Sequence, residues 1–145
     1  MRLKLIASSA FVVALMACGS AYAQDDSDDP QVDCSNAQVQ TEMNYCSEKD
    51  FDAADKALNV QYKKTRAAMQ SVDGDLEEDQ RGAEQALLKA QRAWVDYRDG
   101  ECLAEGYQYE GGSMQPMVIS GCKATLTRAR TKELKALEDG PEGNQ

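Results

Sequence analysis

The chain has 145 residues, a formal net charge of −9 and no histidine. The lack of histidine removes the commonest general base and metal ligand, and the acidic charge argues against binding to nucleic acid or anionic membranes. Ser113 lies in Gly-Gly-Ser-Met-Gln, which is not a nucleophile elbow and follows no predicted strand. We therefore expect a protein that is not an enzyme, uses no metal or cofactor and is attracted to basic partners.

The first 23 residues have the pattern of a secretory signal. Arg2 and Lys4 precede an apolar run at 5–17, and Ala21-Tyr22-Ala23 forms a small-x-small cleavage site. The apolar run is too short to remain in a membrane as a spanning helix. The pattern predicts a periplasmic or secreted bacterial protein without a transmembrane segment.

A second interpretation applies to the same segment. Leu15-Met16-Ala17-Cys18 is similar to a lipoprotein signal, which would put a lipid anchor on Cys18. We favour cleavage after Ala23, because methionine is unusual at the lipobox position of Met16. Such cleavage removes two basic residues and no acidic one, which lowers the net charge from −9 to −11.

The mature chain is long enough for one domain. Residues 24–33 are acidic and nearly free of apolar groups, which predicts a disordered leader. We expect a single helical domain at 34–137 and a disordered tail at 138–145.

Apolar side chains recur at helical spacing in three stretches. From Ala37 the first stretch continues to residue 72 without proline or glycine, and Asp73-Gly74-Asp75 is a turn signal. A second helix is predicted over 76–103, and a third from 117–120 to about 137. The predicted fold is all-α: an antiparallel helical hairpin plus a third helix, forming a small three-helix bundle.

Four cysteines remain after the signal, and an even number in an exported chain predicts two disulfides. They are Cys34, Cys46, Cys102 and Cys122. Their spacing contains no Cys-x-x-Cys pair, which argues against zinc. If the helices join in a tight turn at Gly74, Cys46 and Cys102 lie at one level. That favours Cys46–Cys102 with Cys34–Cys122, and leaves the other two connectivities open.

Two polar residues, Gln91 and Arg98, lie within the apolar face of the predicted second helix. The same face carries Trp94 and Tyr97. A buried guanidinium requires a carboxylate partner, and the same level-matching puts Arg98 beside Asp50 and near Asp55. We expect a structural ion pair there, with an anion-binding site as the alternative. The predicted polar seam consists of Asp50, Asp55, Gln91 and Arg98, with Asn44 and Asn59 as further members.

The loop 106–116 is unusually apolar for a loop that contains glycines and a proline. Disulfides at both ends would make it a rigid recognition loop. Alternatively, its tyrosines and methionines cover the end of the core, these being Tyr107, Tyr109, Met114 and Met117. The candidate partner-binding residues are Tyr107, Tyr109, Glu110, Ser113 and Gln115.

Several motifs lie along the predicted domain. They include Asp33-Cys34, Thr41-Glu42-Met43-Asn44-Tyr45-Cys46, Ala54-Asp55-x-x-Leu58-Asn59-x-x-Tyr62, Gln91-x-x-Trp94-x-x-Tyr97-Arg98-Asp99-x-x-Cys102, Tyr109-x-Gly111-Gly112-Ser113-x-x-Pro116 and Leu126-Thr127-x-x-Arg130-x-x-x-Leu134. Together these motifs resemble the LprI N-terminal domain family over residues 34–134. Members are small exported helical proteins, and the family is named after a mycobacterial lipoprotein that inhibits lysozyme.

The resemblance implies an inhibitor of a cell-wall-degrading hydrolase. Lysozyme, a basic protein, is the expected partner, and an acidic domain suits it electrostatically. The alternative is a non-inhibitory envelope module that binds another periplasmic protein or has a structural role.

Overall fold

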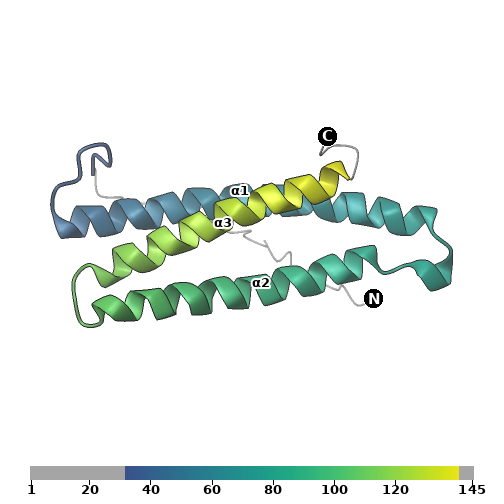
Figure 1. Cartoon of the computed structure of the whole chain (residues 1–145). Helices are drawn as coiled ribbons and strands as arrows, with labels where there is room; N and C mark the ends of the chain where they lie inside the picture. The colour runs from purple at the N-terminus through teal and green to yellow at the C-terminus, as the bar shows by residue number, and fades with distance from the viewer. Residues whose placement is uncertain (1–31, 141–145) are drawn as a thin grey trace, which may run out of the picture. The chain divides into compact units, whose positions relative to one another are not determined.

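The computed structural model describes residues 32–140. The predicted signal, Cys18, most of the acidic leader and the last residues of the tail lie outside this range. The described part contains three long helices, with a single 3₁₀ turn in each connection (Figure 1). In chain order they are α1 (Gln40–Asp75), η1 (Glu78–Gln80), α2 (Ala83–Gly106), η2 (Tyr107–Tyr109) and α3 (Gln115–Asp139). Residues 32–140 contain no strand, and the all-α prediction is confirmed.

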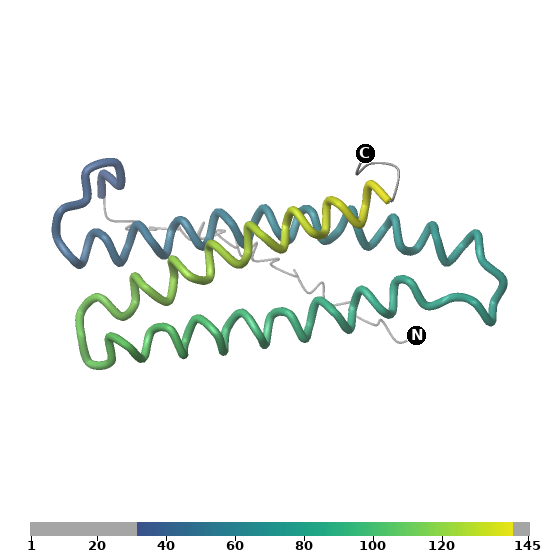
Figure 2. The backbone as a smooth tube through the Cα atoms, viewed as in Figure 1, coloured from purple at the N-terminus to yellow at the C-terminus, as the bar shows by residue number. Residues whose placement is uncertain are grey.

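The three helices form a bundle in which α1 and α2 are antiparallel and α3 runs in the direction of α1 (Figures 1 and 2). The most extensive packing is between α1 and α3, and α1 packs least against α2. The α1–α2 hairpin extends beyond the end of α3 (Figure 2). None of the helices within 32–140 has an apolar stretch long enough to cross a membrane.

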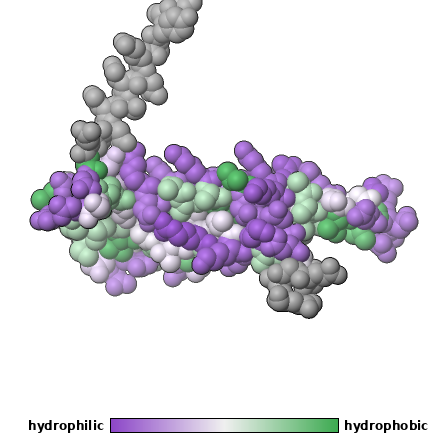
Figure 3. All heavy atoms as spheres, turned by 90° about the horizontal axis from the view of Figure 1, so that it is seen from above, coloured by the Kyte–Doolittle hydropathy of each residue, from purple (hydrophilic) through white to green (hydrophobic). Residues whose placement is uncertain are grey.

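The core is small and contains one central leucine from each helix. Leu58, Leu87 and Leu134 are buried, and Tyr62, Met69 and Trp94 pack against them. Two threonines are also fully buried, and the hydroxyl of Thr65 donates to the carbonyl oxygen of Leu134 at 2.8 Å. Hydrophilic side chains cover most of the face seen in Figure 3. Since this core buries little apolar area, polar contacts and the two disulfides contribute a larger share of the stability than they would in a domain with a large core.

The second helix begins at Ala83, not at Leu76 as predicted. Its first turn is capped by Asp73, near the end of α1. The Asp73 carboxylate accepts hydrogen bonds from the backbone N–H groups of Gly82 and Ala83, both at 2.8 Å, and of Glu84 at 3.0 Å. These groups have no partner within the helix, and a negative charge there is favoured by the helix dipole. The cap therefore stabilises the start of α2 at Ala83, and residues 76–82 form a connection outside both helices.

Replacing Asp73 by asparagine is expected to lower the melting temperature at pH 7 by a few degrees. The backbone hydrogen bonds from Gly82, Glu84 and Ala83 hold the pKa of the Asp73 carboxyl below its ordinary value. A depressed folded-state pKa stabilises the protein above the unfolded pKa, and the gain is lost as the pH falls through the folded pKa. Melting curves of the two proteins should therefore converge as the pH falls below the ordinary pKa of an aspartate carboxyl and through the lowered pKa of Asp73.

The control for this experiment is Asp79→Asn, which removes the same charge from the nearby connection between α1 and α2 without touching the cap. Asp79 is exposed in η1. Equal losses in the two variants would show that the cap adds nothing beyond its charge.

The disulfides pair neighbouring cysteines, so the preferred pairing was wrong. Cys34 bonds to Cys46 and Cys102 to Cys122, each with a Cα–Cα distance of 5.5 Å. The prediction assumed that the two helices join in a tight turn at Gly74. Residues 76–82 instead lie outside both helices, which shifts α2 along α1 by roughly 10 Å, the length of about seven helical residues. Cys102 is then no longer level with Cys46, and the segment before α1 loops back so that Cys34 reaches Cys46 (Figure 1).

The other helix ends differ from the predicted ones by a few residues. α1 begins at Gln40 instead of Ala37, and α3 occupies Gln115–Asp139, with Pro116 in its first turn, where proline is tolerated. α2 continues to Gly106, which is buried against α3. A Cβ atom on residue 106 would lie 2.4 Å from Cγ1 of Ile119. Glycine at this position therefore lets α2 approach α3 next to the disulfide.

Candidate binding surface at the disulfide-bonded loop

Arg98 lies at the junction of the three helices, with its side chain only 8% exposed. Its Nη1 donates to Oδ1 of Asp55 on α1 at 3.1 Å and to Oγ1 of Thr127 on α3 at 3.4 Å. Its Nε donates to Oδ1 of Asp99 at 2.9 Å. The structure thus places Arg98 and Asp55 together and gives the buried charge two carboxylate partners.

Aromatic rings complete the Arg98 site. The guanidinium carbon lies 5.0 Å from the centre of the Phe51 ring and 5.3 Å from that of Trp94, within cation–π range. Lys123 pairs with Asp99 at 3.2 Å. Burial raises the pKa of Asp99, but the hydrogen bonds from Arg98 and Lys123 outweigh it and lower this pKa below its ordinary value. Arg98 and Lys123 are thus balanced by Asp55 and Asp99, and the cluster has no net formal charge.

The remaining seam residues are dispersed. The prediction was that Arg98 pairs with Asp50 or Asp55; it pairs with Asp55, while Asp50 is exposed and pairs with Arg128 of α3. The cause is again the displacement of α2. Gln91 accepts a hydrogen bond from Nε of Arg130 at 3.1 Å. Asn59 donates to Asp55 at 2.8 Å and so belongs to the cluster, whereas Asn44 lies near the loop.

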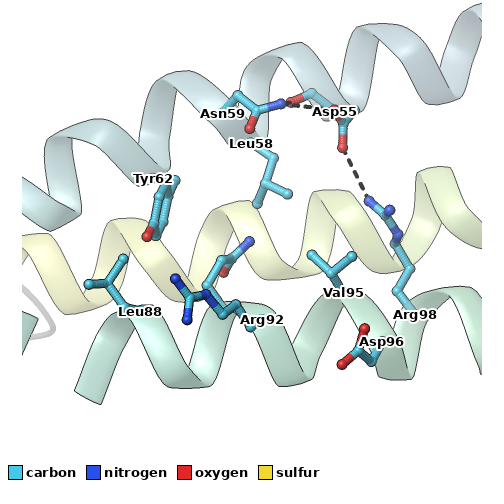
Figure 4. Close-up of a pocket in the computed structure, with 10 residues that line it drawn as sticks. Asp55, Leu58, Asn59, Tyr62, Leu88, Arg92, Val95, Asp96 and Arg98 are labelled. Carbon is cyan, nitrogen blue, oxygen red and sulfur yellow. Dashed lines mark hydrogen bonds and ion pairs between the residues drawn. The ribbon is translucent and has the colours of Figure 1, made fainter. Parts of the chain in front are cut away.

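A groove of about 420 Å³ separates α1 from α2 beside this cluster (Figure 4). Its apolar lining comes from Leu58, Tyr62, Leu88 and Val95. The polar lining consists of Asp55, Asn59, Gln91, Arg92, Asp96 and Arg98. Arg98 is held by Asp55, as Figure 4 shows. Because charges of both signs line the groove, it has no preference for a cation or an anion. Among residues 32–140, no three acidic or cysteine side chains converge as metal ligands would.

The predicted recognition loop is fixed to the helices on both sides. The Cys102–Cys122 disulfide joins α2 to α3 below the loop. Asn44 of α1 donates to the carbonyl oxygen of Ser113 at 2.9 Å, and Ser47 donates to that of Met117 at 2.9 Å. These bonds connect the loop to the first turns of α1, so its position depends on all three helices.

The tyrosines of the loop point outward. Tyr107 is 60% exposed and Tyr109 is 40% exposed, and Met114 is also exposed. The alternative interpretation was that these side chains and Met117 cover the end of the core. The three exposed side chains do not cover it, and only Met117 is half-buried. Glu110 and Ser113 are exposed as well, whereas Gln115 is half-buried and donates to Oε2 of Glu110 at 2.6 Å.

The end of α2 adds apolar surface that the sequence reasoning missed. Tyr97 was expected on the buried face, yet it is 54% exposed. Five of the nine large exposed apolar residues of the described chain lie between residues 97 and 114, namely Tyr97, Leu103, Tyr107, Tyr109 and Met114. One signal was available, because Glu101 and Glu105 follow Tyr97 at intervals of one turn and mark that face as exposed. Such a concentration of apolar side chains is typical of an interaction surface.

The segment that carries these side chains is also acidic. The segment from Asp96 to Cys122 contains five acidic residues and one basic residue, Arg98, which is buried and paired.

A model of a family described as lysozyme inhibitor LprI matches residues 33–134. The chain belongs to this family. The match includes both disulfides, the Arg98 cluster and the loop, and it confirms the resemblance found in the motifs.

A relative also matches the chain over almost its whole length. The chain is 45% identical over 138 residues to the uncharacterized protein R02472 of Rhizobium meliloti (strain 1021), a match that covers 93% of this chain and 98% of the relative. No solved structure matches the chain. An LprI chain belongs to an inhibitor family, which implies a lysozyme-like partner at the level of the family and fits a protein that is not an enzyme. Two disulfides fit an oxidising compartment outside the cytoplasm.

Proposed function

We propose that this LprI protein inhibits a cell-wall-degrading hydrolase of the lysozyme type. It does so by docking the loop 106–116, the tyrosine loop, onto the enzyme. The observation that carries the proposal is the group of exposed apolar side chains between residues 97 and 114. It lies in an acidic segment that a disulfide closes. We further propose that cleavage after Ala23 leaves the domain 34–137 in the periplasm or outside the cell.

The chemistry of this surface supports inhibition in two ways. Exposed tyrosines supply large contact areas at a small cost in side-chain entropy, and a loop fixed at both ends loses little further freedom on binding. The carboxylates around the loop attract a basic enzyme and raise the association rate. The residues proposed to contact the enzyme are Tyr107, Tyr109, Glu110, Ser113 and Gln115.

The test is the lysis of a peptidoglycan suspension by a basic lysozyme, with oxidised residues 24–145 added at near-stoichiometric amounts. We expect lysis to slow, and Tyr107→Ala with Tyr109→Ala to weaken inhibition by about tenfold or more. The matched control is Val60→Ala with Val72→Ala, since these valines are also exposed but lie far from the loop in sequence.

Two outcomes contradict the proposal. One is unchanged lysis at tenfold excess of the protein over several lysozymes. The other is recovery of a different envelope protein that requires Tyr107 and Tyr109 while lysozyme is untouched, which would favour a non-inhibitory binding module.

A further inference from the structure

A second groove, of about 450 Å³, lies between α2 and α3 directly beside the loop. One wall is formed by Tyr97, Glu101 and Glu105 of α2. The other includes Val118, Cys122 and Leu126 of α3. Within each set the residues are four apart, so each wall is one row of side chains along a helix.

The α2 wall presents unused negative charge. Glu101 and Glu105 are exposed, and neither carboxylate forms an ion pair or side-chain hydrogen bond within residues 32–140. Two carboxylates one turn apart on one helix face repel each other, which slightly disfavours the helix. Tyr97 continues the row and is 54% exposed, so much of its side chain is accessible beside the carboxylates.

The α3 wall is largely apolar, with Thr125 as its polar member. Val118 and Leu126 are half-buried, and Cys122 between them is bonded to the buried Cys102. The disulfide joins the two walls and fixes the width of the groove. Since the groove combines an apolar wall with a negative one, it suits a side chain with an aliphatic stem and a cationic end.

We propose that this groove receives an arginine side chain of the basic partner. The stem packs against Val118 and Leu126, and the guanidinium lies between Glu101 and Glu105. Arginine fits better than lysine, because its planar fork can reach two carboxylates while stacking on Tyr97.

The inference rests on the proposed function, because the groove and the loop form one surface. Glu105 comes just before the loop and Met117, a further lining residue, comes just after it. A partner seated on Tyr107 and Tyr109 is therefore adjacent to the groove. The loop supplies contact area, and the groove selects partners that present an arginine there.

The inference can be tested without lysozyme by an NMR titration. The probe is a short blocked peptide of alternating leucine and arginine, added to the oxidised, isotope-labelled protein. We expect chemical-shift changes concentrated at residues 97–105 and 118–126. Glu101→Gln with Glu105→Gln should weaken binding about tenfold, roughly threefold for each exposed charge, and added salt should weaken binding to the wild type.

The matched control is Glu77→Gln with Glu78→Gln, which removes two charges from the far end of the hairpin. Both are exposed in or beside η1. Peptide binding to the control should stay within about twofold of the wild type. An equal loss in both double variants, or shift changes centred on residues 76–84, would overturn the inference, because attraction would then follow net charge alone. Unchanged melting curves would show that the variants fold.

Lysozyme assays with the same variants separate this inference from the proposed function. If the peptide binds the groove and no lysozyme is inhibited, arginine recognition stands and the proposed function fails. If lysozyme is inhibited equally by the wild type and by Glu101→Gln with Glu105→Gln, the proposed function stands and the arginine groove is rejected.

Discussion

Replacement of Arg98 by alanine is expected to lower the free energy of unfolding by about 3 kcal/mol. The side chain is 8% exposed, contacts all three helices and lies over two aromatic rings. Its removal leaves Asp55, Asp99 and Thr127 without their shared donor and opens a cavity beside Trp94. The partner carboxylates are partly exposed, at 39% and 46%, so water replaces some of the lost hydrogen bonds and limits the effect.

Urea titration measures this loss. Arg98→Lys should lose less than the alanine variant, because it keeps the charge but has neither the fork nor the stacking surface. Arg92→Ala, six residues earlier on α2, is the matched control: Arg92 is exposed, and its replacement should cost under about 0.5 kcal/mol. A loss below about 1 kcal/mol for Arg98→Ala would contradict a structural role for the cluster.

Removal of the Cys102–Cys122 disulfide, by serine at both positions, is expected to cost about 3 kcal/mol. The bond closes a segment with a sequence separation of 20, which restricts the unfolded chain. It also fixes the base of the tyrosine loop, so inhibition of a lysozyme should weaken along with the stability.

Serine at Cys34 and Cys46 provides the comparison. This disulfide closes a shorter segment, with a separation of 12, and its loss should cost slightly less. Inhibition should persist in this variant wherever the protein remains folded, because the bond joins the segment before α1 to the second turn of α1 and does not close the tyrosine loop. Equal loss of inhibition in both serine pairs, measured at a temperature where both are folded, would contradict a specific role for the loop.

The helices and the burial of Arg98 were predictable because both depend on local periodicity. An apolar face that repeats along 40–75 marks a helix regardless of what it packs against. A charged residue inside such a face implies a carboxylate nearby, and Asp55 is that carboxylate. A connection between α2 and α3 was also predictable, since Gly111 and Gly112 interrupt the helical pattern, although Gly106 and Pro116 lie within the helices.

The disulfide pairing and the exposure of Tyr97 were not predictable in the same way, because they depend on how long the connections are in space. Asp73 reaches past residues 76–82 to cap α2, a contact over nine to eleven residues that no periodicity encodes. The resulting displacement of α2 moved Cys102 away from Cys46 and Asp50 away from Arg98. Tyr97 is exposed because α3 packs chiefly on α1 and leaves that side of α2 uncovered.

The pairing of neighbouring cysteines also bears on how the protein matures. Each disulfide lies within one contiguous segment, Cys34–Cys46 at the start of α1 and Cys102–Cys122 around the loop. A chain that reaches an oxidising compartment from its N-terminus onward can close the first bond before the second pair of thiols arrives. Sequential oxidation then gives the native pairs directly, with no need for an isomerase to reshuffle them.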